Sequence, residues 1–364
     1  MKGEPRLSVA KNPHGGKDVA RPVPAPVVWA LIGDKAGDNA AVLALAEAVG
    51  WPVAVKRLVY NGLYRMPNVV PVARRARLVR ARSDALAPPW PDLVIAIGRR
   101  SVPVARWIGR ASGGRARLIH LGRPRAPYAW FDLIVTTPQY ALPARPNVLT
   151  VPLPLTASRR ASDGETYADL PRPRVAVLAG GRVGPWRLDG ADRLGCEASL
   201  LAGRHGGSLL IATSRRTGVA VADALIGAVE APARVHRYGQ GANPYPAILA
   251  GADAFVVTTD SVSMMADAAA TGRPLLLFEA AYRPTFAQRL GAAARALPGY
   301  DAAVDLGLIA RPRALGRVAA ALNAAGHARR FDRDDDLGPP AVAYDADGIK
   351  ARVVARVHAL LEGA

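Results

Sequence analysis

Cysteine is almost absent from this chain, and long apolar runs are missing altogether. The single cysteine, Cys196, excludes a disulfide within the chain and a zinc site built from several cysteines. No stretch of about 18 uncharged apolar residues occurs, so no transmembrane helix is predicted. The first residues lack the apolar core of a secretory signal peptide. Together these absences predict a cytoplasmic protein.

Several familiar binding motifs are also missing. No zinc finger, RNA-binding aromatic motif or basic zipper is present, so nucleic acid is not expected as a partner despite a formal net charge of +19. The GxGxxG turn and a Tyr-x-x-x-Lys pair are absent, which argues against a dinucleotide fold and an epimerase built on one. The positive charge then suits a phosphate-bearing substrate or an anionic membrane surface. No metal and no cofactor are predicted.

Short apolar runs alternate with helical periodicity in each half of the 364 residues. Runs such as 27–32 and 93–97 end at a glycine, as buried parallel strands do. The alternation predicts an α/β protein with two doubly wound Rossmann-like domains facing across a cleft. The predicted parts are a disordered tail (1–25), a first domain (26–155), a linker (156–173), a second domain (174–330), and a C-terminal break and helix that pack back towards the first domain (331–364).

Ligands of doubly wound sheets bind beyond the carboxyl ends of the strands, so the loops there supply the candidate residues of the first domain. The loop after the first strand carries two glycines that allow close approach to a ligand, and Asp38 or Asn39 can cap the next helix. Each loop also has a plain structural interpretation, as a turn, a solvated arginine pair or a structural histidine. The candidates for proton transfer are Asp34, Asp38 and His120, and those for binding an acceptor or an anion are Gly33, Gly37, Asn39, Arg99 and Ser101.

The strongest pattern in the second domain is the serine turn, residues 258–263, between a predicted strand and a predicted helix. Backbone N–H groups at a helix start, with the hydroxyls of Ser261 and Ser263, can bind a diphosphate without a metal. Asp267 follows near enough to accept from a ribose hydroxyl. Taken singly, these residues also fit a bare N-cap and a solvated charge. The candidate donor-binding residues are Gly181, Ser214, Arg215, Arg216, Tyr245, Asp260, Ser261, Val262, Ser263 and Asp267.

A run of arginines in the first domain has helical spacing with apolar residues between them. Such a helix can rest on an anionic membrane that carries a lipid acceptor, which would place the protein on the inner face of the cytoplasmic membrane. An ordinary solvated helix face explains the same spacing equally well. The arginines concerned are Arg74, Arg75, Arg77, Arg80 and Arg82.

Leu249-Ala250-x-Ala252-Asp253, the serine turn, and Asp267-x4-Gly272-x-Pro274 together resemble the donor half of GT-B glycosyltransferases that act on lipid-linked sugars. In those enzymes an acidic ribose-binding residue, usually Glu, stands five positions before the glycine of Gly-x-Pro. The resemblance implies that role for Asp267.

A closer resemblance is to the elongated-mitochondria (mitochondrial fission) family, found in plants and many bacteria. It is carried by Ser214-Arg215-Arg216-Thr217, Asn243-x-Tyr245 and Thr259-Asp260-Ser261-Val262-Ser263-Met264, and it covers roughly residues 27–325. Gly218 stands where the family pattern has Pro. Plant members are known as fission factors that recruit a dynamin-related protein, and bacterial members are described as sugar-nucleotide-related proteins.

The resemblance implies two functions of different classes. The first is a glycosyltransferase that moves a sugar from a nucleotide-diphosphate sugar to a lipid-linked or cell-envelope acceptor, with positive charge stabilising the leaving diphosphate. The second is a non-catalytic adaptor that keeps the fold for protein or membrane interaction. Loss of the serine turn would abolish the first function and leave the second intact.

Overall fold

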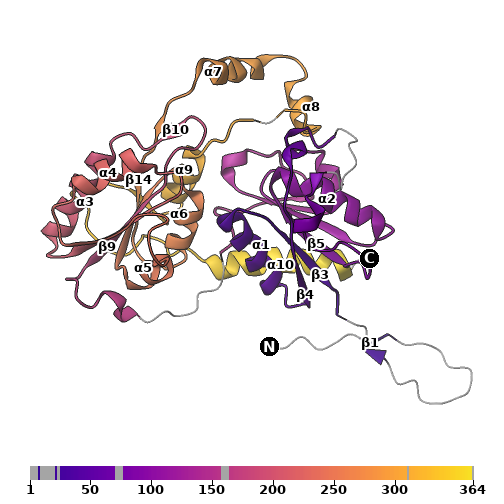
Figure 1. Cartoon of the computed structure of the whole chain (residues 1–364), viewed down its shortest axis with the longest axis horizontal. Helices are drawn as coiled ribbons and strands as arrows, with labels where there is room; N and C mark the ends of the chain where they lie inside the picture. Colours follow the sequence, from indigo (N-terminus) through magenta and orange to yellow (C-terminus); the bar gives the residue numbers. More distant parts are fainter. Residues whose placement is uncertain are drawn as a thin grey trace, which may run out of the picture.

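The structure is a computed structural model that describes residues 7–8, 21–22, 25–69, 77–156, 164–309 and 311–362. Within these ranges, two parallel sheets of six strands each form the centres of two domains (Figure 1). The predicted α/β fold with two doubly wound Rossmann-like domains is therefore confirmed.

The N-terminal sheet has the strand order β4-β3-β5-β6-β7-β8. Alternate residues of β3 face opposite sides, so Val28 packs with helix α1 and Trp29 packs with helix α2. The edge strand β4 is less covered, and Val55 is 44% exposed. The elements are β3 (Val28–Ile32), α1 (Ala36–Ala48), β4 (Val53–Arg57), η1 (Gly62–Arg65), η3 (Arg80–Arg82), β5 (Leu93–Ile97), α2 (Gly98–Ala111), β6 (Arg117–Leu121), η4 (Tyr128–Trp130), β7 (Leu133–Thr136), η5 (Pro138–Tyr140) and β8 (Val148–Thr150).

The C-terminal sheet has the strand order β12-β11-β9-β13-β14-β16. Helices again cover both faces: Leu178 of β9 packs with Met265 of α6, and Val177 packs with Leu194 of α3. The elements are β9 (Arg174–Ala179), β10 (Trp186–Arg187), α3 (Ala191–Arg204), β11 (Ser208–Thr213), α4 (Val219–Gly227), β12 (Ala233–His236), α5 (Tyr245–Gly251), β13 (Ala254–Thr258), α6 (Val262–Ala269), β14 (Leu275–Phe278), α9 (Gly316–Ala324) and β16 (Arg329–Arg330).

An arm (residues 281–309 and 311–314) leaves the C-terminal domain and reaches the N-terminal one (Figure 1). Its elements are β15 (Ala281–Tyr282), α7 (Phe286–Ala293), η7 (Ala294–Ala296) and α8 (Tyr300–Asp305). The arm is fixed at its far end, where Asp305 lies 2.6 Å from Arg145 and the Ala314 N–H donates to the Gln139 carbonyl at 2.9 Å. The two domains are therefore joined on this side by polar contacts.

Helix α10 (Ala346–Glu362) crosses from the C-terminal domain to the N-terminal domain (Figure 1). Val353 and Val357 are fully buried in the core that also contains Val42 of α1. Phe331 and Tyr344, which precede the helix, pack on the C-terminal domain instead. The crossing is thus made by α10 itself, and residues 331–344 stay with the second domain.

The predicted tail falls largely outside the described residues, as do residues 157–163 of the predicted linker. Within the described part of the tail, β1 (Leu7–Ser8) and β2 (Arg21–Pro22) pair as antiparallel strands. Within the linker, η6 (Gly164–Tyr167) brings Tyr167 into the core of the C-terminal domain. The end of the linker therefore packs as part of the second domain.

Candidate functional site

Each sheet has one position where the chain reverses the direction in which strands are added. In the N-terminal sheet, β4 and β5 lie on opposite sides of β3, and in the C-terminal sheet, β11 and β13 lie on opposite sides of β9. Loops at such switch points diverge and leave a crevice in which doubly wound proteins bind ligands. Residues 33–39 and 98–101 lie at the first switch point, and residues 180–181 and 258–263 lie at the second.

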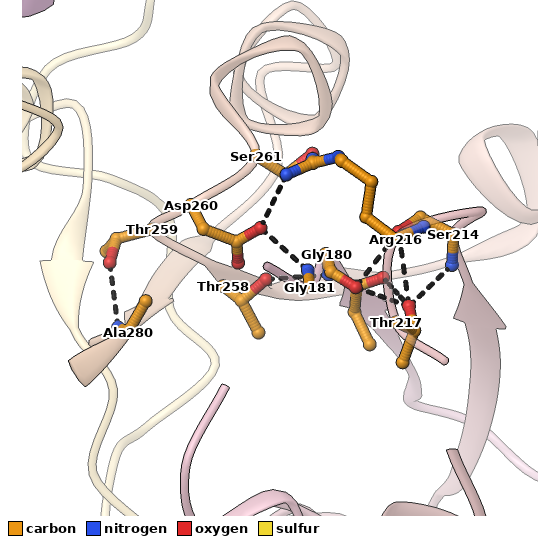
Figure 2. Close-up of polar contacts among 11 residues, drawn as sticks. Gly180, Gly181, Ser214, Arg216, Thr217, Thr258, Thr259, Asp260, Ser261 and Ala280 are labelled. Atoms are coloured by element: carbon orange, nitrogen blue, oxygen red, sulfur yellow. Dashed lines mark hydrogen bonds and ion pairs between the residues drawn. The ribbon is translucent and has the colours of Figure 1, made fainter. Parts of the chain in front are cut away.

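Two glycines let the loops of the second switch point approach closely (Figure 2). The Gly180 N–H donates to Thr258 Oγ1 at 2.8 Å, and the Gly181 N–H donates to Asp260 Oδ2 at 2.7 Å. A Cβ at Gly180 would lie 2.2 Å from Asp260 Oδ2, and one at Gly181 would lie 2.0 Å from the Arg216 carbonyl oxygen. Both positions therefore require glycine.

The loop 214–217 after β11 holds its own shape through hydroxyl groups. Ser214 Oγ donates to the Gly180 carbonyl at 2.9 Å, and Thr217 Oγ1 accepts from the Ser214 N–H at 2.9 Å (Figure 2). Both hydroxyls, including that of Ser214, which was predicted to bind the donor, are engaged in contacts within the protein itself. Arg215 is exposed to solvent, whereas Arg216 turns inward.

Arg216 lies at the start of α6 (Figure 2). Its Nη1 donates to Asp260 Oδ2 at 3.1 Å and its Nη2 donates to Ser261 Oγ at 3.3 Å, while a third of the side chain remains exposed. Burial raises the pKa of the Asp260 carboxyl, and the Gly181 N–H and the Arg216 charge oppose that rise. Asp260 thus orients the guanidinium while only partly offsetting its charge.

The serine turn is mostly buried, and contacts from neighbouring segments hold it in place. Thr259 Oγ1 accepts from the Ala280 N–H at 2.9 Å, and Ser261, the N-cap of α6, accepts from Arg216 rather than from its own helix (Figure 2). Ser261 and Val262 are buried, and Ser263 is exposed. The exposed parts of this region are therefore Ser263 and the edge of Arg216, beside the first N–H groups of α6, which have no partner within the helix.

A second polar pair lies one turn along α6. The Tyr245 hydroxyl, at the start of α5, donates to Asp267 Oδ2 at 2.9 Å. Ser263 and Asp267 are four residues apart in the helix and therefore share a face. The structure thus brings together the predicted phosphate-binding and ribose-binding residues on one side of α6.

The two switch points face each other across the domain boundary. A Cβ at Gly37, at the start of α1, would lie 3.7 Å from Ser263 Cβ and Oγ. A Cβ at Gly98 would lie 3.8 Å from Asp38 Oδ2. Residues 33–39 of the N-terminal domain therefore adjoin the exposed part of the serine turn.

The profile of the family described as Mitochondrial fission ELM1 matches residues 36–335 of this chain. The chain belongs to the mitochondrial fission ELM1 family. This membership confirms the resemblance carried by the residues of the serine turn and the loop 214–217.

Two relatives and one solved structure show the range of similarity. An uncharacterized protein of Rickettsia prowazekii is 25% identical over 305 residues, which cover 71% of this chain and 84% of that protein. The mitochondrial fission protein ELM1 of Arabidopsis thaliana is 29% identical over 217 residues, and this match spans 51% of each chain. The spinosyn forosaminyltransferase SpnP is 14% identical, with 94% and 95% of the two chains covered and a TM-score of 0.48.

The three candidates for proton transfer lie in different environments. Asp34 is paired with Arg100, whose hydrogen bond and charge lower the pKa of the Asp34 carboxyl. His120 is fully buried, with its ring nitrogens 3.3 Å from the carbonyl oxygens of Gly98 and Gly122. Burial lowers the pKa of His120 to about 4. Asp38 forms an ion pair of 3.6 Å with Lys35, and its side chain is 41% exposed, against 67% for Asp34. Its neighbour Gly37 adjoins Ser263.

The predicted acceptor-side residues have mainly structural contacts. Asn39 does not cap α1, whose N-cap is Lys35; its amide instead exchanges two hydrogen bonds of 2.9 Å with the backbone of Gly33. The buried Ser101 hydroxyl bonds to the carbonyl oxygens of Ile97 and Gly98 within α2, so it does not face a ligand. Arg99 donates to the Tyr64 carbonyl at 2.7 Å.

Of the five arginines expected on one membrane-facing helix, the three that the structure describes do not share an exposed helical face. Arg74 and Arg75 lie outside the described residues. Arg77 is buried and donates to Asn68 Oδ1 and to the Pro67 carbonyl, which corrects its predicted exposure. Arg80 and Arg82 are exposed in the short helix η3.

No helix in the described ranges is long and apolar enough to cross a membrane. No group of His, Cys, Asp and Glu side chains in the same ranges could hold a metal ion.

Residues outside the predicted set also shape the site. Thr217 and Thr258 hold the loops after β11 and β13 through their hydroxyls, and Gly180 admits the Asp260 carboxylate. The consecutive glycines 180–181 at a strand end were the sequence signal for such close packing.

Proposed function

We propose that this protein is a glycosyltransferase whose C-terminal domain binds a nucleoside-diphosphate sugar at the serine turn. The observation that carries the proposal is the meeting of two switch points, where Ser263 adjoins Gly37. A ligand bound to one domain at this place lies against the loop of the other. A donor and an acceptor can therefore be held together between them.

The diphosphate would bind at the start of α6. The unpaired N–H groups of the first turn and the helix dipole favour an anion there, and the exposed Ser263 hydroxyl adds a donor. Arg216 is held at the same point by Asp260 and Ser261. Its charge would stabilise the nucleoside diphosphate as it leaves, without a metal ion.

The ribose would lie one turn along the same helix. Asp267 shares a face of α6 with Ser263, and a carboxylate accepts hydrogen bonds from sugar hydroxyls. Tyr245 donates to Asp267 and thereby fixes the orientation of the carboxylate. The Asp found here in place of the usual Glu is one methylene shorter, and the tyrosine contact compensates by holding it in place.

Asp38 is the group that we assign to proton transfer. The acceptor hydroxyl attacks the anomeric carbon, the bond from that carbon to the diphosphate oxygen breaks, and Asp38 takes the hydroxyl proton. Asp34 is a weaker base because Arg100 stabilises its ionised form, and His120 is buried away from any substrate. One displacement of this kind inverts the anomeric centre.

A panel of nucleoside diphosphates and nucleotide sugars tests the donor site. At least one is expected to raise the thermal midpoint, and Asp267→Ala combined with Ser263→Ala is expected to abolish the shift. Asp192→Ala, an exposed acid in the first turn of α3, is the matched control and should keep the full shift.

Asp38→Asn separates binding from chemistry. The variant is expected to bind the nucleotide sugar as the wild type does and to lose at least a hundredfold in sugar transfer or slow donor hydrolysis. A folded wild-type protein that gives no shift with any ligand of the panel would contradict the donor site. That result would favour the adaptor function, which the name of the Arabidopsis thaliana relative also suggests.

A further inference from the structure

Four arginines gather where the arm meets the N-terminal domain. This arginine cluster consists of Arg99 at the start of α2, Arg123 and Arg125 after β6, and Arg313 in the arm. The guanidinium carbons of Arg123 and Arg313 lie 5.4 and 5.3 Å from the centroid of the same ring, that of Tyr140. Two chain segments far apart in sequence thus present cations to one point.

Backbone contacts position the other two members of the cluster, Arg99 and Arg125. Asn68 Nδ2 lies 2.9 Å from the Arg99 carbonyl oxygen and 3.2 Å from that of Arg125, so a single amide joins the two loops. The buried Arg77 donates to Asn68 Oδ1 at 3.1 Å and orients that amide. Arg125 is held in the left-handed backbone region, with φ of 51°. The positions of these arginines are therefore built into the fold.

The cluster lacks the acidic partners that neighbouring arginines have. Arg100, Arg145 and Arg311 each pair with an aspartate. Across the described ranges, no carboxylate forms an ion pair with a member of the cluster. Like charges held together without an acid repel one another, and a bound anion would relieve that repulsion.

The proton affinities of the cluster reflect the same crowding. Burial, together with the charges of Arg125 and Arg313, lowers the pKa of Arg123 to about 10. Burial and the charges of Arg99 and Arg313 likewise lower the pKa of Arg125. The Arg123 guanidinium remains charged at neutral pH, because a pKa near 10 is still well above 7.

We propose that the arginine cluster binds a phosphate or diphosphate group of the acceptor substrate. Guanidinium groups bind phosphate oxygens through paired N–H donors, which suits an anion with several oxygens. The cluster lies at the carboxyl edge of the N-terminal sheet, and Arg99 directly follows Gly98, which adjoins Asp38. An acceptor held there by its phosphate would extend along this edge towards the serine turn. The inference rests on the proposed function and names the chemical class of its acceptor.

Inorganic pyrophosphate, titrated calorimetrically at low ionic strength, is the probe. The test variant combines Arg125→Gln with Arg313→Gln, since within the described part of the chain only the backbone carbonyls of these two residues, and not their side chains, take part in hydrogen bonds. The control combines Arg110→Gln with Arg352→Gln, two exposed arginines on α2 and α10 that change the net charge equally. Circular dichroism checks that both variants fold.

The donor site is removed from the titration by Ser263→Asp, which places a like charge beside the diphosphate and suits the first turn of a helix. Pyrophosphate is expected to bind the Ser263→Asp protein. Its affinity should fall at least tenfold when Arg125→Gln and Arg313→Gln are added, and should change less than twofold when the control pair is added. If pyrophosphate binds the test variant as tightly as its Ser263→Asp parent, or does not bind that parent at all, the proposal that the arginine cluster binds phosphate is overturned. Failure of every nucleotide to bind the wild type overturns the donor site alone, because the pyrophosphate titration does not depend on it.

Discussion

The carboxylate of Asp260, at the end of β13, accepts a hydrogen bond of 2.7 Å from the backbone N–H of Gly181, at the end of β9. The loops that follow two such strands leave the sheet towards opposite faces. This bond ties them together at the point where they part, and Arg216 donates to the same oxygen. The shape of the proposed donor site therefore depends on a buried carboxylate that no solvent reaches.

Gly180→Ala tests the close approach beneath this carboxylate. The added methyl group would lie 2.2 Å from Asp260 Oδ2, so the loop must shift, and a loss of about 1–3 kcal/mol in the free energy of unfolding is expected. Urea denaturation measures it. Gly203→Ala, in α3 with nothing within 4 Å of its Cβ, should instead gain about 0.5–1 kcal/mol. Equal stability of the two variants would contradict the contact.

Asp260→Asn tests the raised pKa of that carboxyl. The folded protein holds the Asp260 proton to a higher pH than the unfolded chain, whose pKa is near 3.8, so the contribution of this group to stability falls as the pH rises through the folded pKa. The neutral variant should therefore have a higher thermal midpoint than the wild type at pH 7, with the difference vanishing towards pH 4. It should also bind nucleoside diphosphates more weakly, because Arg216 loses its ion pair. A variant that is less stable at pH 7 would show that the ion pair outweighs the cost of burial.

His120→Gln tests a buried neutral histidine. The unfolded chain binds a proton at this residue below pH 6.5 and the folded protein only near pH 4, so stability is lost as the pH falls between those values. A pKa difference of that size corresponds to about 3 kcal/mol. The variant should flatten the slope of unfolding free energy between pH 7 and pH 4. His205→Gln, at an exposed position, should leave the slope unchanged.

A disulfide between the domains tests their apposition. The Cβ of a cysteine at position 37 would lie 3.7 Å from the Cβ of residue 263, which is within the range of native disulfides. Gly37→Cys with Ser263→Cys, in a background of Cys196→Ser, should cross-link on mild oxidation and migrate faster in a non-reducing gel. Gly203→Cys replaces Gly37→Cys in the control pair, which should remain reduced. A test pair that also stays reduced would contradict the contact between the two switch points.

The sheets could be predicted from the sequence because central strands such as β3, β5 and β9 are apolar runs that end at a glycine, and such runs carry their own signal. The serine turn could be placed for the same reason, since it follows one of these runs directly. The path of the arm could not be predicted. It depends on contacts such as Asp305 with Arg145 and Gly307 against the backbone of Ala126, which join residues far apart in the sequence.

The candidate residues differ in how far they are buried, and the local sequence pattern does not reveal which of them are buried. Ser261 and Ser263 look equivalent in the sequence, yet Ser261 is covered by Arg216 and Ser263 faces the other domain. The arginine at position 77 fits a solvated helical face by spacing, but its side chain lies inside the domain and bonds to Asn68. Such differences are set by neighbours from other strands and loops.

The crossing of α10 has a consequence for the order in which this chain can fold. Val353 and Val357 complete the core of the domain that is synthesised first, yet in the sequence they follow the whole of the second domain. Until they have been made, the apolar face of α1 around Val42 and Leu45 lacks part of its cover, and an uncovered face of this kind promotes aggregation. The first domain therefore reaches its final packing only after the second has been made. A chain truncated before α10 lacks part of the core of its N-terminal domain, although the truncation lies beyond the C-terminal one.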